Sequence, residues 1–198
     1  MSSDVNPASG GIILVPLDLA MSNSNTLAYA AELCKNGGHQ MVIMHAVHEP
    51  ADHPGLYQEL EPSQQLIPAE LRAERICNRV LREAQQQFPH AAALASARLR
   101  IVAGLPAQRI VEVADQVDAT LIVMTSAERR GLSKLLHGSV TDSVAGKTSI
   151  PVLRLHRMDT RFVSSNDNPA AVTVLNPEGA KGTSSPRKTG ILHLPQAV

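Results

Sequence analysis

The sequence predicts an α/β fold: a three-layer open sandwich in which a five-stranded, mostly parallel sheet carries helices on both faces. Five short apolar runs alternate with segments whose apolar residues recur at every third or fourth position. The first pattern is typical of strands buried on both faces, and the second of amphipathic helices. Parallel neighbouring strands require crossover connections, and right-handed crossovers place helices over the faces of the sheet.

Local patterns predict the first two strands and the helix between them. Gly11–Asp18 is an apolar run that ends in Pro and Asp, as expected for a buried strand followed by a loop. Ser22–Lys35 has apolar residues at helical spacing, and Asn36-Gly37-Gly38 is typical of a helix terminator. Gln40–Val47 is a second apolar run and predicts the second buried strand.

The same patterns predict the remaining elements. Glu49–Ser63 contains three prolines and several acidic residues, so we expect a surface loop, either a lid or a long connection. Gln64–Phe88 has the spacing of one long amphipathic helix, with Pro68 in its first turn. The later elements are a strand at Ala97–Ala103, a helix at Pro106–Gln116, a strand at Thr120–Thr125, a helix at Ser139–Lys147 and a strand at Ile150–His156.

Composition divides the chain into one domain and two flanking segments. Its 198 residues, 43% of them hydrophobic, fit one globular domain with additional material. From about Thr160, Asn, Ser, Gly, Lys and Pro dominate, which indicates a flexible extension. We expect a flexible N-terminus at 1–10, a domain at 11–157 and a flexible extension at 158–198. Ala171–Leu175 or Ile191–Leu194 could dock as a short edge strand, although disorder is expected where so little can be buried.

Charge and residue types argue against several classes of partner. Lys plus Arg equals Asp plus Glu at 18 each, and aromatic residues make up only 2%. The chain therefore lacks the basic field and the stacking platforms that nucleic acids require. Cys34 and Cys77 have no metal or redox spacing, which suits a reducing cytoplasm. We find no secretion signal and no apolar run near the roughly 18 residues of a membrane span, so the predicted location is cytoplasmic, without membrane insertion.

One edge of the predicted sheet collects the residues that could bind a ligand. In open α/β sheets, ligands bind outside the carboxyl ends of the strands. Asp18, the loop after Val47, Gly104 and the loop that begins at Thr125 all lie at this edge. The last loop runs to Gly138-Ser139, which opens a helix, and a strand followed by a glycine-bearing loop and a helix start can hold phosphate through backbone amides.

Several segments resemble the universal stress protein family in order and spacing. Ile12–Asp18 and Met44-His45-Ala-Val match the first two strands of that family, and the resemblance covers roughly Gly10–Leu155. It implies a Rossmann-like, adenine nucleotide alpha hydrolase-like fold and a dimer, in a family divided into ATP binders and non-binders. The other matching segments are Ile101-Val-Ala-Gly-Leu-Pro, Ile110–Ala114, Leu121-Ile-Val-Met, Leu135-Leu-His-Gly-Ser-Val-Thr and Ile150-Pro-Val-Leu.

The phosphate loop departs from the pattern of the ATP binders. Those proteins resemble one another in a Gly-x-x-Gly-(nine residues)-Gly-Ser/Thr loop. Counted back from Gly138, the first two glycines are replaced by Thr125 and Glu128. A β-branched residue forced to positive φ costs about 1–3 kcal/mol, and a like charge about 4 Å from a phosphate costs about 4 kcal/mol at an effective dielectric near 20. Tight triphosphate binding is therefore not expected, while an adenosine- or AMP-like ligand remains an alternative.

The candidate nucleotide crevice has competing interpretations that involve no ligand. Ser139 and Asp142 form a capping-box-like pair that would satisfy the helix start. Asp18 either holds a ribose or adenine edge, as the resemblance implies, or caps the following helix. The candidate nucleotide-binding residues are Pro16, Leu17, Asp18, Met124, Thr125, Gly138, Ser139 and Val140, with the phosphate part degraded at Thr125 and Glu128.

No catalytic set or metal site is predicted. Gly146-Lys147-Thr148 resembles the end of a P-loop, but the required earlier glycine and following helix are missing. Neither cysteine has a plausible base at a typical spacing, and no Gly-x-Ser-x-Gly elbow is present. A metal cluster is the weaker interpretation of five potential ligands that lie close together in the sequence: His45, His48, Glu49, Asp52 and His53.

These observations lead to three hypotheses about function. The first is a non-enzymatic, homodimeric stress-response or regulatory protein that acts by binding partners, with ATP binding weak or lost. Its dimer would form through Ile150–Leu155, a closing edge strand with unpaired backbone. The second is an ATP- or AMP-responsive switch that uses the crevice, with Glu49–Ser63 as a lid. The third, a weak nucleotide hydrolase, lacks an identifiable base and metal site.

Overall fold

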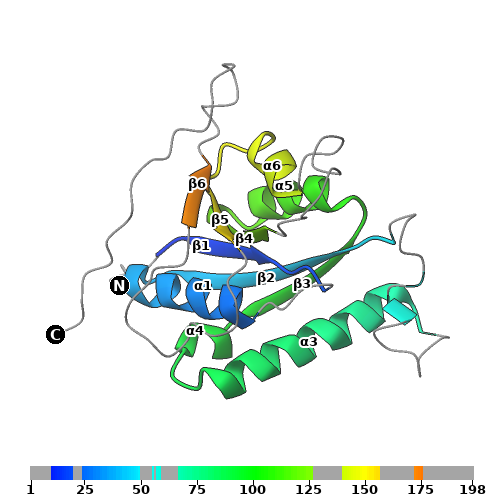
Figure 1. Cartoon of the computed structure of the whole chain (residues 1–198), viewed down its shortest axis with the longest axis horizontal. Coiled ribbons are helices and arrows are strands. Elements are labelled where there is room, and N and C mark those ends of the chain that lie inside the picture. The colour runs from blue at the N-terminus through cyan, green and yellow to red at the C-terminus, as the bar shows by residue number, and fades with distance from the viewer. Residues whose placement is uncertain are drawn as a thin grey trace, which may run out of the picture.

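The computed structural model describes residues 10–19, 24–49, 55, 57–58, 67–126, 140–156 and 172–175. Strands and helices alternate along most of these ranges, as predicted (Figure 1). The elements are β1 (Ile12–Pro16), α1 (Ser24–Gly37), β2 (Gln40–Val47), α3 (Ala69–Gln87), α4 (Ala92–Ala95), β3 (Arg98–Ala103), α5 (Pro106–Gln116), β4 (Ala119–Ser126), α6 (Val140–Ala145), β5 (Val152–His156) and β6 (Val172–Leu175). The chain thus has the predicted α/β fold, and in the described ranges its sheet has six strands instead of five.

The strands form a single sheet in the order β3-β2-β1-β4-β5-β6. The first five strands in this order run parallel to their neighbours, and β6 runs antiparallel to β5. Leu14 lies at the centre, beside Val42 of β2 on one side and Ile122 of β4 on the other. The strand order therefore changes direction at β1, which makes the gap between the carboxyl ends of β1 and β4 a topological switch point.

Helices cover both faces of the sheet because successive strand residues point to opposite sides. On one face, Ile13 and Ile43 pack with residues of α1, α3 and α4. On the other, Leu14 and Ile122 pack with residues of α5 and α6. Figure 1 shows α1, α3 and α4 on one side of the strands and α5 and α6 on the other. Each fully buried aliphatic side chain contributes about 1.5–3 kcal/mol to stability. A core that is almost entirely aliphatic can therefore stabilise this fold with few aromatic side chains.

The bounds of three predicted helices differ from the structure, and α1 runs to Gly37 instead of ending at Lys35. Pro68 lies at the N-cap of α3 with an extended ψ of 145°, so the helix begins at Ala69 and not at Gln64. Proline disfavours the helical region for the residue before it, which explains this start. The helix predicted at Ser139–Lys147 is described as the shorter α6, and the short helix α4 was not predicted.

The predicted extension contributes to the sheet. Val172–Leu175 forms β6 beside β5, which is the edge-strand alternative for the Ala171–Leu175 patch. The structure does not describe residues 1–9, 157–171 and 176–198, so the Ile191–Leu194 patch and the predicted flexible N-terminus lie outside the described residues. No helix in the described ranges has the length and apolar character needed to cross a membrane.

Candidate functional site

The carboxyl ends of four neighbouring strands meet at one edge of the sheet. The Leu17 N–H, just beyond β1, donates to the Met44 carbonyl of β2 over 2.8 Å. The Gly104 N–H, just beyond β3, donates to the Val47 carbonyl at the end of β2 over 3.0 Å. Gly104 has a φ of 131°, a conformation that essentially only glycine adopts. These backbone hydrogen bonds therefore connect the carboxyl ends of β1, β2 and β3.

The predicted site residues of β1 and β4 lie on adjacent strands. Pro16 ends β1 half-buried, Leu17 beyond it is buried, and Asp18 is exposed. Met124 and Thr125 lie near the end of β4, the first buried and the second half-buried. The topology thus brings residues 16–18 and 124–125 to the switch point, as predicted. Because α1 begins only at Ser24, Asp18 is not the residue that precedes this helix.

The helix side of the predicted crevice is described only from Val140. Val140 is the first residue of α6 and is 44% exposed. An ion pair between Asp142 and Arg154 ties this helix to β5. Gly138 and Ser139, together with Glu128, lie outside the described residues, so the predicted phosphate loop and its capping alternative remain predictions.

Thr125 has a partner that the sequence did not reveal. Its hydroxyl is hydrogen-bonded to that of Thr26 in the first turn of α1, and Thr26 is buried. β4 continues through Thr125, which lies opposite Leu155 of β5. Extended backbone suits a β-branched residue, so the strain considered for a threonine at positive φ does not arise. Thr125 ties the end of β4 to the start of α1.

A buried hydrogen-bonded chain connects β1, β2 and the following segment. His45 of β2 is 7% exposed, and its Nδ1 lies 2.9 Å from the Leu17 carbonyl oxygen. Its Nε2 lies 3.0 Å from the hydroxyl of Tyr57, which is fully buried. The backbone N–H of His48 donates to the same hydroxyl over 3.0 Å. Because a carbonyl only accepts, Nδ1 carries the proton and Nε2 accepts from Tyr57.

The electrostatic surroundings of His45 favour a neutral ring. Burial lowers the pKa of His45, while the hydrogen bond to the Leu17 carbonyl and the charge of Asp18 oppose this shift. Burial also raises the pKa of the Tyr57 hydroxyl, so Tyr57 keeps the proton that it donates. The neutral imidazole and the phenol form one polar link within the core, next to the exposed Asp18.

Tyr57 is an exception to the surface loop predicted at Glu49–Ser63, most of which lies outside the described residues. Prolines and acidic residues dominate that segment, yet the structure buries Tyr57 against the sheet. Because Tyr57 is one of only two tyrosines in a chain with 2% aromatic residues, an isolated aromatic ring was the signal that could have revealed this anchor. Residues 59–63 are not described, and the lid interpretation stays a prediction.

His45, one of the five residues considered as metal ligands, is not free to bind a metal ion. Both ring nitrogens of His45 are engaged in hydrogen bonds within the protein, so neither is available to a cation. Within the ranges that the structure describes, no group of three or more His, Cys, Asp and Glu side chains could hold a metal ion. Asp52 and His53 lie outside those ranges.

The two cysteines lack the properties of nucleophiles. Both are buried and unpaired. Burial raises the pKa of Cys34 to about 11 and that of Cys77 to about 12. The thiolate is the reactive form of cysteine, so these thiols are unreactive near neutral pH.

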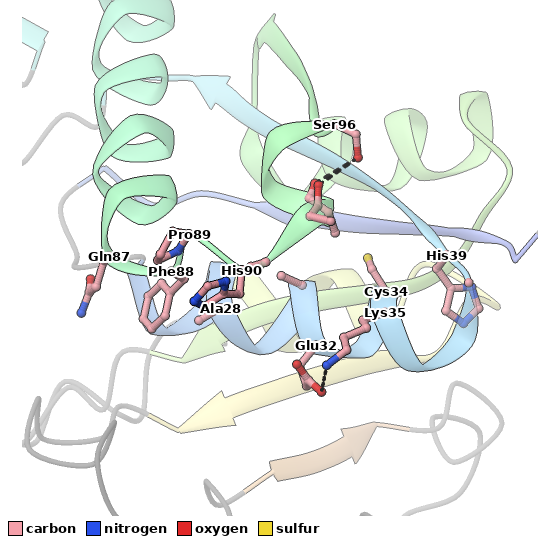
Figure 2. A pocket seen from close by; sticks show the side chains of 15 residues that line it. Ala28, Glu32, Cys34, Lys35, His39, Gln87, Phe88, Pro89, His90 and Ser96 are labelled. Carbon is pink, nitrogen blue, oxygen red and sulfur yellow. Dashed lines mark hydrogen bonds and ion pairs between the residues drawn. The ribbon is translucent and has the colours of Figure 1, made fainter. Parts of the chain in front are cut away.

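A separate groove of about 800 Å³ lies near the amino ends of β2 and β3 (Figure 2). It contains no residue of the predicted crevice. Glu32 and Lys35 of α1 form an exposed ion pair of 3.9 Å at its rim. Figure 2 shows Cys34, Lys35 and His39 toward one end of the groove and Phe88, Pro89 and His90 toward the other. The groove and the carboxyl edge are therefore two different places on the molecule.

The fold and the switch-point geometry are those of an open α/β protein, and comparison identifies the family. The universal stress protein family profile matches residues 11–156, so the chain belongs to that family. Universal stress protein A homolog 1 of Coxiella burnetii is 24% identical over 142 residues, covering 71% of this chain and 92% of that protein. Stress response protein NhaX of Bacillus subtilis is 42% identical over 53 residues, 27% of this chain, and the match spans only 32% of that relative.

A solved structure has the same fold. The structure of protein MJ0577, a universal stress protein of Methanocaldococcus jannaschii, superposes with a TM-score of 0.52 and 20% sequence identity. The superposition covers 76% of this chain and 99% of that one. At this identity, the likeness supports the shared fold alone.

Proposed function

We propose that this universal stress protein is a non-enzymatic stress-response or regulatory protein of the cytoplasm. It acts as a homodimer through binding of a protein partner, and its ATP binding is weak or lost. One observation carries the nucleotide part of this proposal: Thr125 is an extended, hydrogen-bonded strand residue at the position where the ATP binders have the first loop glycine. Balanced charge supports a protein partner over nucleic acid, and two free cysteines fit a reducing compartment.

The surroundings of Thr125 oppose a phosphate cradle. A phosphate-binding loop needs backbone amides that turn toward the ligand. Here β4 remains in the ladder with β5 through Ser126, which lies opposite His156. Reshaping this strand end would break the hydroxyl pair of Thr125 and Thr26 and the last ladder positions. The negative charge of Glu128 in the sequence adds repulsion toward phosphate.

The described side chains support a non-enzymatic role. The Cys34 and Cys77 thiols are buried with raised pKa values. The buried His45 imidazole uses both nitrogens in structural hydrogen bonds. A general base must reach the proton that it removes and a nucleophile must be activated, and none of these three groups meets its requirement.

A nucleotide-responsive switch is the second candidate, and a specific observation favours it. Asp18 is exposed at the switch point beside the end of β4, where a carboxylate can accept hydrogen bonds from ribose hydroxyls. Such a ligand would contact Asp18 and Met124 without needing the altered phosphate loop. AMP or adenosine, and not ATP, would then be the natural ligand class.

Isothermal titration of nucleotide-stripped protein with ATP and AMP in the presence of magnesium tests these proposals. The titration also includes cAMP and dAMP, which are bound in two solved universal stress proteins. We expect ATP to bind no more tightly than about 1 mM, equivalent to about −4 kcal/mol. Micromolar ATP binding would overturn the main proposal, whereas AMP binding alone would establish the second candidate.

Two variants assign the cause of weak ATP binding. The double variant Thr125→Gly and Glu128→Gly restores the glycines of the binding pattern, and we expect its ATP affinity to rise at least tenfold. Thr26→Val is the matched control, because it removes the partner of the Thr125 hydroxyl and leaves the loop sequence unchanged. An equal gain in the control would assign the effect to the start of α1 and not to the loop.

A further inference from the structure

β6 occupies the sheet edge through which the homodimer is proposed to form. From the sequence, β5 is a closing edge strand with unpaired backbone. In the structure, β6 runs antiparallel along β5, and Figure 1 shows it outside β5 at the end of the sheet. The paired positions are Val152 with Leu175, Leu153 with Val174, Arg154 with Thr173 and Leu155 with Val172. The chain's own extension therefore covers the edge that was expected to be free.

The two strands differ in how firmly they are embedded. Val152, Leu153 and Leu155 of β5 are at most 7% exposed, because helices cover both faces of that strand. Val174 of β6 is 50% exposed, although it lies opposite the buried Leu153. Among the β6 side chains that the structure describes, Leu175 packs against the core on the α5 and α6 side. Short edge segments with little apolar contact open at lower free energy than core strands.

The connection between β5 and β6 is long in sequence. Fifteen residues, 157–171, separate the two strands, whereas hairpin loops usually have two to five. A strand that is joined through a connection of this length can leave the edge while β5 stays in the sheet. β5 itself is fixed by its ladder with β4, from Ile122 opposite Val152 to Ser126 opposite His156.

A second copy of the chain would require the same backbone groups in the same orientation. A two-fold axis perpendicular to the sheet reverses strand direction, so β5 of one copy meets β5 of the other antiparallel. β6 already runs antiparallel to β5 and places apolar residues opposite Leu153 and Leu155. Each β5 edge can pair with only one strand at a time. Occupation by β6 and pairing with a second copy are therefore mutually exclusive.

We propose that β6 is an internal competitor for the dimer edge: while Val172–Leu175 pairs with β5, the edge is closed to a second copy, and release of β6 opens it. This inference rests on the proposed homodimer through Ile150–Leu155. The ligand of the open edge is β5 of another chain of the same sequence. The extension thus controls assembly instead of being a passive tail.

A variant of the full-length chain in which β6 cannot pair with β5 tests whether β6 competes with dimerisation. The double variant Thr173→Pro and Val174→Pro removes two backbone N–H groups and prevents regular pairing of β6. We expect its dimerisation constant, measured by sedimentation equilibrium, to be at least tenfold tighter than that of the wild type. Thr183→Pro with Ser184→Pro is the matched control in the same extension and should leave the constant unchanged.

A disulfide that holds β6 on β5 distinguishes failure of this inference from failure of the homodimer proposal. Leu153→Cys with Val174→Cys places thiols on opposed residues of the two strands, at a separation that a disulfide can bridge. We expect the oxidised form to be monomeric and the reduced form to match the wild type. A locked chain that still dimerises overturns the competitor but leaves a homodimer through another surface. If the proline variant stays monomeric, while circular dichroism shows it folded, both the competitor and the β5 dimer are refuted.

Discussion

Removing one oxygen atom from Tyr57 tests the buried link at the carboxyl edge. Tyr57→Phe keeps the ring in its buried position but deletes the hydroxyl that lies 3.0 Å from His45 Nε2 and accepts from the His48 N–H over 3.0 Å. His45 is only 7% exposed, so water cannot easily replace the Tyr57 hydroxyl as the donor to its Nε2. Such a buried unsatisfied group costs about 1–3 kcal/mol.

The total effect can be estimated from the two contacts. His48 is partly buried, so water can replace part of its hydrogen bond, and that loss lies near the lower limit of about 0.5 kcal/mol. Together the two losses lower the free energy of unfolding by about 1.5–3.5 kcal/mol. In a chain of this size, each kcal/mol corresponds to about 2–4 °C, which predicts a melting temperature about 3–14 °C lower.

Urea unfolding followed by circular dichroism, with calorimetry for the melting temperature, measures this loss. Tyr29→Phe is the matched control: Tyr29 is the other tyrosine of the chain, half-buried in α1, and its hydroxyl makes no hydrogen bond among the described residues. Its substitution should cost less than about 0.5 kcal/mol. Equal destabilisation by the two variants would refute the role assigned to the Tyr57 hydroxyl.

Three further predictions concern the same structure. Burial lowers the pKa of His45, so the unfolded state binds a proton at this residue at higher pH than the folded state does. The free energy of unfolding should therefore decrease as the pH falls below about 6.5. An NMR titration that gives His45 a pKa above this value would contradict the assignment. Gly104→Ala, at a φ of 131°, should lower the free energy of unfolding by about 1–3 kcal/mol. Gly38→Ala, at a φ of 64° with open space around it, should lower it by less. Equal losses in urea unfolding would refute the comparison. With pKa values raised to about 11 and about 12, Cys34 and Cys77 should resist a thiol reagent in the native protein at pH 8 and react after denaturation, whereas rapid labelling of the native protein would show an accessible thiolate.

Sequence patterns predicted the elements whose signals are local. The apolar runs at Gly11–Asp18 and Gln40–Val47 correspond to β1 and β2, because a strand covered on both faces must be apolar at consecutive positions. The helix at Pro106–Gln116 was predicted with the bounds that the structure has, since proline at its start and a periodic apolar face mark it clearly. The relative positions of Asp18 and Thr125 followed from the parallel order of the strands.

Features that depend on distant partners were missed. Thr26 and Thr125 are hydrogen-bonded across 99 residues of sequence, and neither residue has a local signal for the other. Tyr57 lies among prolines and acidic residues, so local composition indicated the surface while burial beside His45 decided its place. Polar pairing and long-range packing overrode local preference in both cases.

The sequence alone determined the α/β class, the mostly parallel sheet, the family and the departure of the phosphate loop from the binding pattern, because these depend on periodicity, spacing and residue identity. Only the tertiary structure decided that Thr125 remains in β4 and contacts Thr26, that Tyr57 anchors the carboxyl edge and that β6 covers β5. Each of these contacts joins residues that are not neighbours in the sequence, separated by 99 positions for Thr26 and Thr125 and by 12 for His45 and Tyr57. Their stability depends on which backbone and side-chain groups the folded sheet leaves without a partner, a property that no local stretch of sequence contains.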